Sequence, residues 1–171
     1  IEFRNNENIV NQLRISDDIK TELEDSLLLC YTGLSHNSGK IHDKQKMDML
    51  NDKQKEYAKI SKSIAYDMKS RLLKGDLDNF GDLLDKAWQT KKEFSNEISS
   101  PYLDEIYDYA LKNGALGGKL LGAGGGGYFI FYVPTFKKIS LSQALNNKKL
   151  TTEYFTFDDV GLRHWITKKK Q

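Results

Sequence analysis

The residues with the clearest chemical implication are the glycines that crowd positions 114–127. Glycine loses more conformational entropy on folding than any other residue, so such a cluster indicates a backbone that needs positive φ angles or a close approach to a ligand. Successive N–H groups in a loop of this kind can hold an anion, and a neighbouring lysine such as Lys119 adds positive charge. The segment favours phosphate binding, and a tight connection between two elements without a ligand is the alternative.

Two common phosphate-binding loops do not fit this segment. The glycines contain the spacing G-x-G-x-x-G, but a dinucleotide-binding fold places a helix after that motif, whereas residues 128–133 form a strand-like hydrophobic run. A Walker loop requires a glycine and a hydroxyl at the positions that Asn113 and Leu120 occupy. The signature elements of protein kinases are also absent from the sequence. A different class of phosphate-handling protein is therefore indicated.

The run that starts at Lys119 and ends at Gly127, followed by a hydrophobic strand, resembles the third conserved motif of the GHMP kinases. This superfamily includes galactokinases, mevalonate kinases and homoserine kinases, and its C-terminal lobe is a ferredoxin-like α+β domain. The resemblance implies that the run supports an ATP site and packs against the ATP-binding loop of another lobe. The implied cofactor-binding residues are Lys119, Gly122, Ala123, Gly124, Gly125, Gly126 and Gly127.

A narrower resemblance comes from the apolar residues 27–31, which lead into Thr32, Gly33 and a serine-rich turn. Together with Gly-Gly-Lys-Leu-Leu before the glycines, this pattern is similar to the heptose 7-phosphate kinases of the superfamily. Those enzymes phosphorylate the anomeric hydroxyl of D-glycero-D-manno-heptose 7-phosphate. The turn supplies the substrate-binding candidates Ser35, His36 and Asn37, with a plain surface turn as the alternative, and His36 stands where this subfamily leads us to expect an arginine.

The resemblance also implies that residues 1–171 are a single C-terminal domain, separate from an N-terminal lobe that carries the catalytic machinery. The start at Ile1 without a methionine agrees with a longer polypeptide. We therefore expect no catalytic residue here, ATP and Mg²⁺ bound mainly through the other lobe, and no activity from the isolated chain. The alternatives are a stand-alone, non-catalytic ferredoxin-like binding module, or a lobe of a galactokinase or mevalonate-type enzyme.

Composition limits the classes of binding partner and the cellular compartment that we expect. A formal net charge of +2 gives no general electrostatic reason to bind nucleic acid or an anionic membrane. The single cysteine, Cys30, lies in an apolar run and excludes a disulfide framework within the chain, and no apolar run is long enough to span a membrane, so the sequence predicts a cytoplasmic protein. His42 and His164 lack the partner spacing of metal ligands, and we predict no metal site.

Hydrophobic patterning predicts an α+β domain of two layers, in which helices cover an antiparallel sheet of the split βαβ type and additional helices are present. Apolar residues at helical spacing predict helices over residues 57–72, 77–88 and 101–111, the last with Ser100 as its N-cap, and a short helix over 141–145. The acidic pairs at 17–18 and 158–159 are interpreted as turns without a catalytic role. The predicted strands are residues 10–15, 27–32, 128–133, 152–157 and 162–167.

Overall fold

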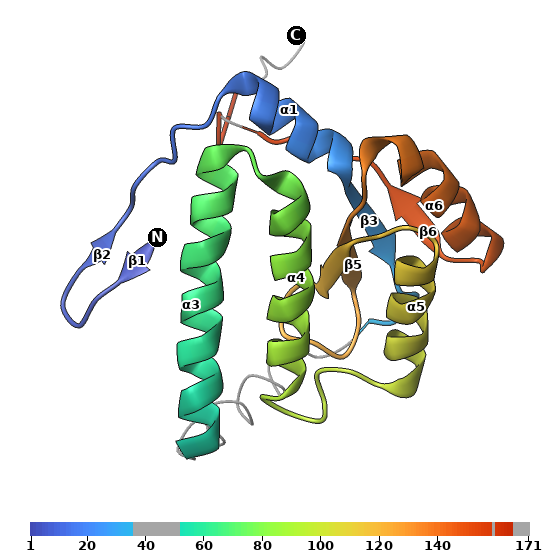
Figure 1. The fold of residues 1–171 in the computed structure, drawn as a ribbon, viewed down its shortest axis with the longest axis horizontal. Helices are drawn as coiled ribbons and strands as arrows, with labels where there is room; N and C mark the ends of the chain where they lie inside the picture. The colour runs from blue at the N-terminus through green and yellow to red at the C-terminus, as the bar shows by residue number, and fades with distance from the viewer. Residues whose placement is uncertain (36–51, 159, 166–171) are drawn as a thin grey trace, which may run out of the picture.

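The structure is a computed structural model that describes residues 1–35, 52–158 and 160–165. Figure 1 shows the arrangement of its helices and strands. In chain order they are β1 (Glu2–Phe3), β2 (Asn8–Ile9), α1 (Asp17–Ser26), β3 (Leu27–Tyr31), α3 (Asp52–Lys74), α4 (Leu77–Lys92), α5 (Pro101–Lys112), β4 (Gly117–Leu120), β5 (Tyr128–Tyr132), α6 (Thr135–Asn147) and β6 (Thr151–Glu153).

The central sheet has the strand order β4-β5-β3-β6, and each neighbouring pair is antiparallel. Strands β3 and β4 are therefore parallel to each other, with β5 inserted between them, and β5 and β6 are related in the same way across β3. Two such interleaved units make the split βαβ arrangement of ferredoxin-like domains. The predicted fold class is confirmed.

Along the two central strands, β3 and β5, successive side chains point to opposite faces of the sheet. Leu28 and Cys30 of β3 face the same side as Phe129 and Phe131 of β5, and all four side chains are buried. Helices α5 and α6 cover this side through an apolar stripe that consists of Leu103, Ile106, Tyr107, Ala110, Leu141 and Leu145. This side of the sheet carries the main hydrophobic core.

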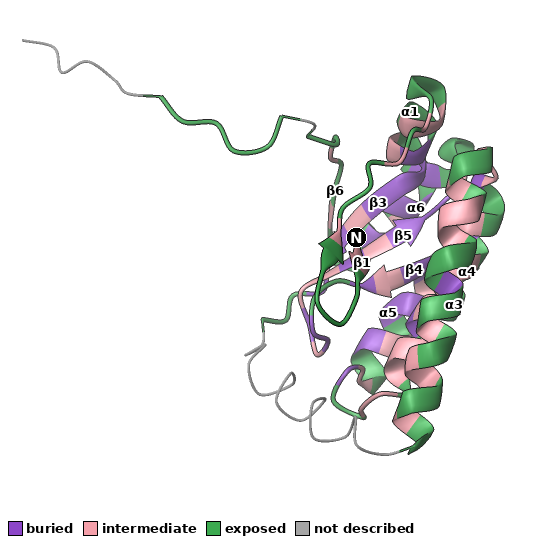
Figure 2. Cartoon of the chain, turned by 90° about the vertical axis from the view of Figure 1, so that its left-hand side faces the viewer, coloured by how far each residue is buried: buried purple, intermediate pink, exposed green. Residues whose placement is uncertain are grey.

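The opposite side of the sheet is covered mainly at one end. There Leu27 and Tyr132 pack with Leu23 of α1 and with Leu77 and Leu84 of α4. Toward the other end, the face is lined by side chains of intermediate exposure, Leu29, Tyr31, Tyr128 and Ile130. Figure 2 shows β3 and β5 in the buried and intermediate colours, whereas the hairpin β1–β2 is mostly exposed.

The first predicted strand, residues 10–15, is wrong, because that segment has no regular structure and a helix follows where a turn was expected. Helix α1 begins after Ser16, whose Oγ accepts from the Ile19 amide at 3.4 Å. Asp17 and Asp18 then lie in the first turn, where negative charge favours the helix dipole. The acidic pair thus marks the start of a helix.

The later strands are shorter than predicted, and one strand was missed. Only Thr151–Glu153 of the predicted strand 152–157 pairs with β3, and residues 162–165 form no strand. The missed strand is β4, whose glycines hide its extended conformation from any pattern based on side chains. The three longer predicted helices are present as α3, α4 and α5, including the cap in which Ser100 Oγ accepts from the Leu103 amide at 3.4 Å. The predicted short helix 141–145 is part of the longer α6, and α1 was not predicted.

Strand β4 lies at the edge of the sheet, and α4 covers that edge at very short range. A Cβ placed on Gly117 would overlap the carbonyl oxygen of Gly81 and lie 2.8 Å from the Asp85 amide. A Cβ on Gly81 would in turn overlap the ring of Tyr132. Glycine at both positions therefore sets the distance between α4 and the strand that leads into the glycine-rich loop.

We predict that Gly117→Ala destabilises the protein by about 3 kcal/mol, because the added methyl group meets rigid backbone rather than a flexible side chain. The matched control is Gly122→Ala, at φ +74° with no atom within 4 Å of the added carbon. That control should cost only about 1 kcal/mol of backbone strain. Urea unfolding measures both, and equal losses would contradict the close approach of α4.

Candidate functional site

The glycine-rich loop, residues 121–127, connects β4 to β5 at the end of the sheet. Its backbone has positive φ at Gly122 (+74°), Gly124 (+123°), Gly125 (+77°), Gly126 (+158°) and Gly127 (+95°). Residues with a Cβ seldom adopt these angles. The composition of the loop is therefore explained first by its own conformation.

Two segments distant in sequence fix the loop through backbone hydrogen bonds. The Gly127 amide donates to Leu34 O at 2.9 Å, and the Gly125 amide donates to Ile98 O at 2.9 Å. Gly124 touches the second segment directly, since a Cβ there would lie 2.8 Å from the Cα of Ile98, which is fully buried. The loop is thus tied to the segment that follows β3 and to the connection between α4 and α5.

Thr32, directly after β3, adds further hydrogen bonds between the loop and the segment that follows β3. Its amide and its Oγ1 both donate to Gly127 O, at 2.9 and 2.8 Å, and the same hydroxyl accepts from the Leu34 amide at 3.3 Å. Tyr102 of α5 donates from its hydroxyl to Thr32 O at 2.9 Å. One buried threonine therefore joins the predicted substrate turn to the predicted ATP loop.

Lys91, in the last turn of α4, holds the start of the loop and was missed in the sequence. Its Nζ donates to Gly122 O at 2.6 Å and to Leu120 O at 3.1 Å. Burial, aided by the positive charge of Lys119, lowers the pKa of Lys91 to about 8. The helical periodicity of α4 gave no signal for this residue, because a lysine at a helix C-terminus is ordinarily solvated.

Lys119, predicted to assist phosphate binding, lies on β4 opposite Ile130 of β5. Its side chain is of intermediate exposure, and burial lowers its pKa below the ordinary lysine value. Within the described part of the chain, no carboxylate forms an ion pair with it. Lys119 thus carries positive charge beside the glycine-rich loop.

The predicted substrate turn is described only in part. Ser35 is exposed and follows Leu34, so it lies one residue from the attachment to Gly127. His36, Asn37 and His42 lie outside the described residues. The structure therefore places Ser35 close to the loop along the chain and gives no position for the other candidates.

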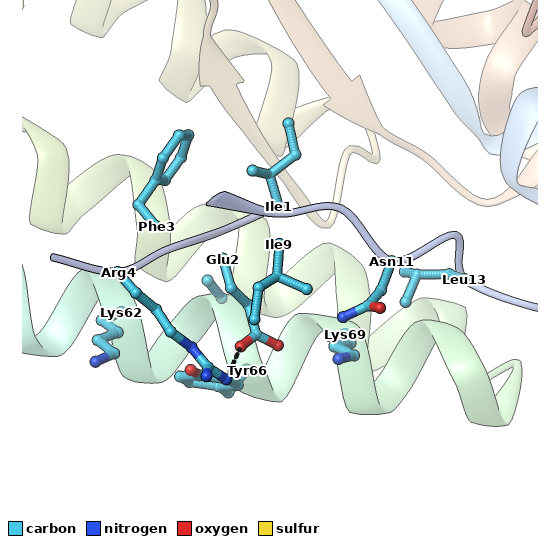
Figure 3. Close-up of a pocket in the computed structure, with 11 residues that line it drawn as sticks. Ile1, Glu2, Phe3, Arg4, Ile9, Asn11, Leu13, Lys62, Tyr66 and Lys69 are labelled. Carbon is cyan, nitrogen blue, oxygen red and sulfur yellow. Dashed lines mark hydrogen bonds and ion pairs between the residues drawn. The ribbon is translucent and has the colours of Figure 1, made fainter. Parts of the chain in front are cut away.

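A separate hollow of about 590 Å³ lies between the N-terminal hairpin and α3. Figure 3 shows its lining, with Phe3, Arg4 and Ile9 from the hairpin and Lys62 and Tyr66 from the helix. It contains none of the predicted site residues. The glycine-rich loop remains the candidate site because several distant segments converge on it.

Two searches of the described ranges bear on metal and membrane binding. Among them, no group of three or more His, Cys, Asp and Glu side chains is placed to hold a metal ion. None of the described helices has the length and hydrophobicity to cross a membrane.

Residues 68–148 match the family model described as GHMP kinases C terminal, a span from within α3 to just past α6. This part of the chain is a GHMP kinase C-terminal domain. The resemblance seen in residues 119–127 is therefore confirmed, and the GHMP domain contains the loop, Lys91 and Lys119.

The relatives of this GHMP domain are kinases of small molecules. The D-glycero-alpha-D-manno-heptose 7-phosphate kinase of Campylobacter jejuni is 35% identical over 96% of this chain and 49% of the relative. The chain thus spans about half the length of that curated relative.

Two crystal structures show the same fold. One, of a Campylobacter jejuni protein, has a TM-score of 0.66 and 32% identity, covering 95% of this chain and 46% of the other. The second, of a D-glycero-D-manno-heptose 1-phosphate kinase from Bacteroides thetaiotaomicron, has a TM-score of 0.56 and 28% identity, covering 87% and 38%.

We predict that Thr32→Val lowers the free energy of unfolding by about 1–2 kcal/mol, because the Leu34 amide loses its acceptor and Gly127 O loses a donor. Hydrogen exchange at the Leu34 amide should accelerate in the same variant. Thr32→Ser keeps the hydroxyl and should behave like the parent protein. A Thr32→Val variant that is as stable as the parent protein would contradict the contribution of the hydroxyl.

Lys91 gives a prediction for the dependence of stability on pH. Its native pKa of about 8 lies below the value of 10.5 for an unfolded lysine. Between these values the unfolded chain binds more protons, so this residue makes the free energy of unfolding rise as pH increases from about 8. Lys91→Met should show a smaller rise than Lys86→Met, an exposed control on the same helix.

Urea unfolding at several pH values checks this difference. The two variants should be compared below about pH 9.5. Burial raises the pKa of Tyr132 to about 12, and a tyrosine with a raised native pKa makes the free energy of unfolding fall as pH increases further. Identical slopes for the two variants would contradict a desolvated ammonium group at Lys91.

Proposed function

We propose that this chain is the C-terminal lobe of an ATP-dependent sugar kinase and that its glycine-rich loop forms one wall of the ATP site. The observation that carries the proposal is the loop itself, held in a positive-φ conformation by Thr32, Ile98 and Lys91 within a GHMP domain. Phosphoryl transfer depends on positioning and on electrostatic stabilisation of the phosphates, and a preformed loop beside lysines supplies both.

The hydrogen bonds of the loop support a role toward phosphate. The amides of Gly125 and Gly127 donate to protein carbonyls, whereas those of Gly124 and Gly126 donate to no acceptor in the described part of the chain. Both of these residues are buried. Buried backbone donors rarely lack a partner, so phosphate oxygens of ATP are suitable acceptors for them.

For the acceptor substrate we propose D-glycero-D-manno-heptose 7-phosphate, phosphorylated at its anomeric hydroxyl. The support is the 35% identity to a kinase named for a heptose 7-phosphate, together with the turn that begins at Ser35. His36 and Asn37 belong to the same proposed substrate turn. We assign the reaction to the cytoplasm, where ATP and a reduced Cys30 thiol are both expected.

The proposal also assigns catalysis of the chemical step to a second lobe. Residues 1–171 form the C-terminal domain, and the base for the acceptor hydroxyl and the Mg²⁺ ligands belong to the lobe that completes the site. The chain alone should therefore show no turnover.

The experiment is an ATP-dependent phosphorylation assay of the intact protein with heptose 7-phosphate, galactose and mevalonate as acceptors. We expect product only with the heptose phosphate, and product with another acceptor alone would overturn the substrate proposal. Absence of activity with every acceptor would favour a non-catalytic module. Turnover by the 171-residue chain would contradict the division of the site between two lobes.

A loop variant connects this activity to the site. Gly124→Ala combines φ of +123° with a close contact to the Ile98 Cα, so it should displace the loop and lower kcat/KM about tenfold or more. The matched control is Gly161→Ala, which also changes a glycine with positive φ but has no atom within 4 Å of the added carbon. Equal activity in both variants would show that the conformation of the loop does not affect catalysis.

A further inference from the structure

Two lysine side chains approach the start of the glycine-rich loop from different elements. Lys91 comes from α4 and donates to the carbonyls of Leu120 and Gly122, and Lys119 precedes Leu120 on β4. The charge of Lys119 contributes to the lowered pKa of Lys91, so the two ammonium groups interact. The fold therefore gathers positive charge at one point of the loop.

Neither ammonium group has an acidic partner among the residues that the structure describes. Lys92, a lysine of intermediate exposure on the same helix as Lys91, does have one, since its Nζ lies 3.2 Å from Asp104. Two like charges that are both partly desolvated raise each other's cost of ionisation. An anion placed between them would remove that cost, and no side chain of the described chain provides it.

The donors that remain unused match a phosphate group. A lysine ammonium has three donors, and Lys91 uses two of them on carbonyls, whereas the ammonium group of Lys119 makes no hydrogen bond in the described part of the chain. The amides of Gly124 and Gly126, two buried residues of the same loop, also donate to no acceptor in the described part of the chain. A phosphate dianion balances two positive charges and has enough oxygens to accept from several of these groups together.

We propose that Lys119 and Lys91 form a binding subsite for one phosphate group at the start of the glycine-rich loop. The inference rests on the proposed function, in which both ATP and the acceptor sugar bring phosphates to this lobe. Lys91 has two tasks, since it positions the loop through two carbonyls and offers its third donor to the ligand. Lys119 acts only on the ligand, which makes it the sharper residue to test.

The test titrates inorganic phosphate into the 171-residue chain with ¹³C-labelled lysines and follows the Cε resonances of Lys91 and Lys119. Both resonances should shift, and Lys119→Gln should weaken the fitted affinity about tenfold or more, since it removes a charge-assisted hydrogen bond. Lys86→Gln, an exposed neighbour on α4, should leave the affinity unchanged. Unshifted lysine resonances, or equal affinities for Lys119→Gln and Lys86→Gln, would overturn the subsite.

The source of the phosphate is decided by repeating the titration on the intact protein with a non-hydrolysable ATP analogue and with heptose 7-phosphate. A loss confined to the ATP analogue in Lys119→Gln assigns the subsite to the nucleotide, and a loss confined to the sugar phosphate assigns it to the acceptor. No loss with either ligand overturns the subsite. Kinase activity is measured separately, so that the two proposals can fail independently. If the protein is an active kinase and Lys119→Gln binds phosphate as the parent protein does, the subsite alone is rejected. If the protein is inactive but its phosphate binding depends on Lys119, the proposed function alone is rejected.

Discussion

In the described part of the chain, one edge of strand β4 has no neighbouring strand, and the way this edge is covered determines much of the site. The outward carbonyls of Gly118 and Leu120 accept from Tyr107 at 3.3 Å and from Lys91 at 3.1 Å instead of from another strand. Helix α4 reaches the edge only because Gly81 and Gly117 remove side chains from the contact. Since exposed strand edges invite unwanted pairing, closing the edge with a helix protects the sheet. The same contact brings the ammonium group of Lys91 to the loop.

Stability of the domain and geometry of the site are therefore linked through α4. The face of this helix that enters the core carries Trp88, which packs against Tyr107 and Phe129 at centroid distances of 6.1 and 5.5 Å. Its last turn carries Lys91, three residues further along the same helix. A change that shifts the aromatic cluster would also move the donor that holds Gly122 O, so core packing and loop position are expected to vary together.

Sequence patterns predicted the parts of the fold that depend on side-chain periodicity. The apolar stripes of α3, α4 and α5 and the runs that became β3 and β5 were sufficient for the fold class, and residues 119–127 were sufficient for the family. Strand β4 was missed because Gly117 and Gly118 carry no side chain to alternate, although their glycines follow from the approach of α4 and of Phe131. Helix α1 was missed because its acidic first turn resembles a loop. The role of Lys91 could not be predicted, since it depends on contacts with Leu120 and Gly122, which lie 29 and 31 positions further along the chain.

The loop also shows how a conformational requirement and a binding role can share one sequence. Gly122 and Gly127 have open space where a side-chain carbon would lie, so their positive φ angles alone require glycine, whereas Gly124 is limited by Ile98 as well. The contacts that hold these glycines come from Thr32, Lys91 and Ile98 of the same domain. Among the described residues, the groups left for a ligand are the amides of Gly124 and Gly126 and the free donors of two lysines. Preorganised donors of this kind bind an anion without first having to be ordered, which is the arrangement that phosphoryl transfer requires.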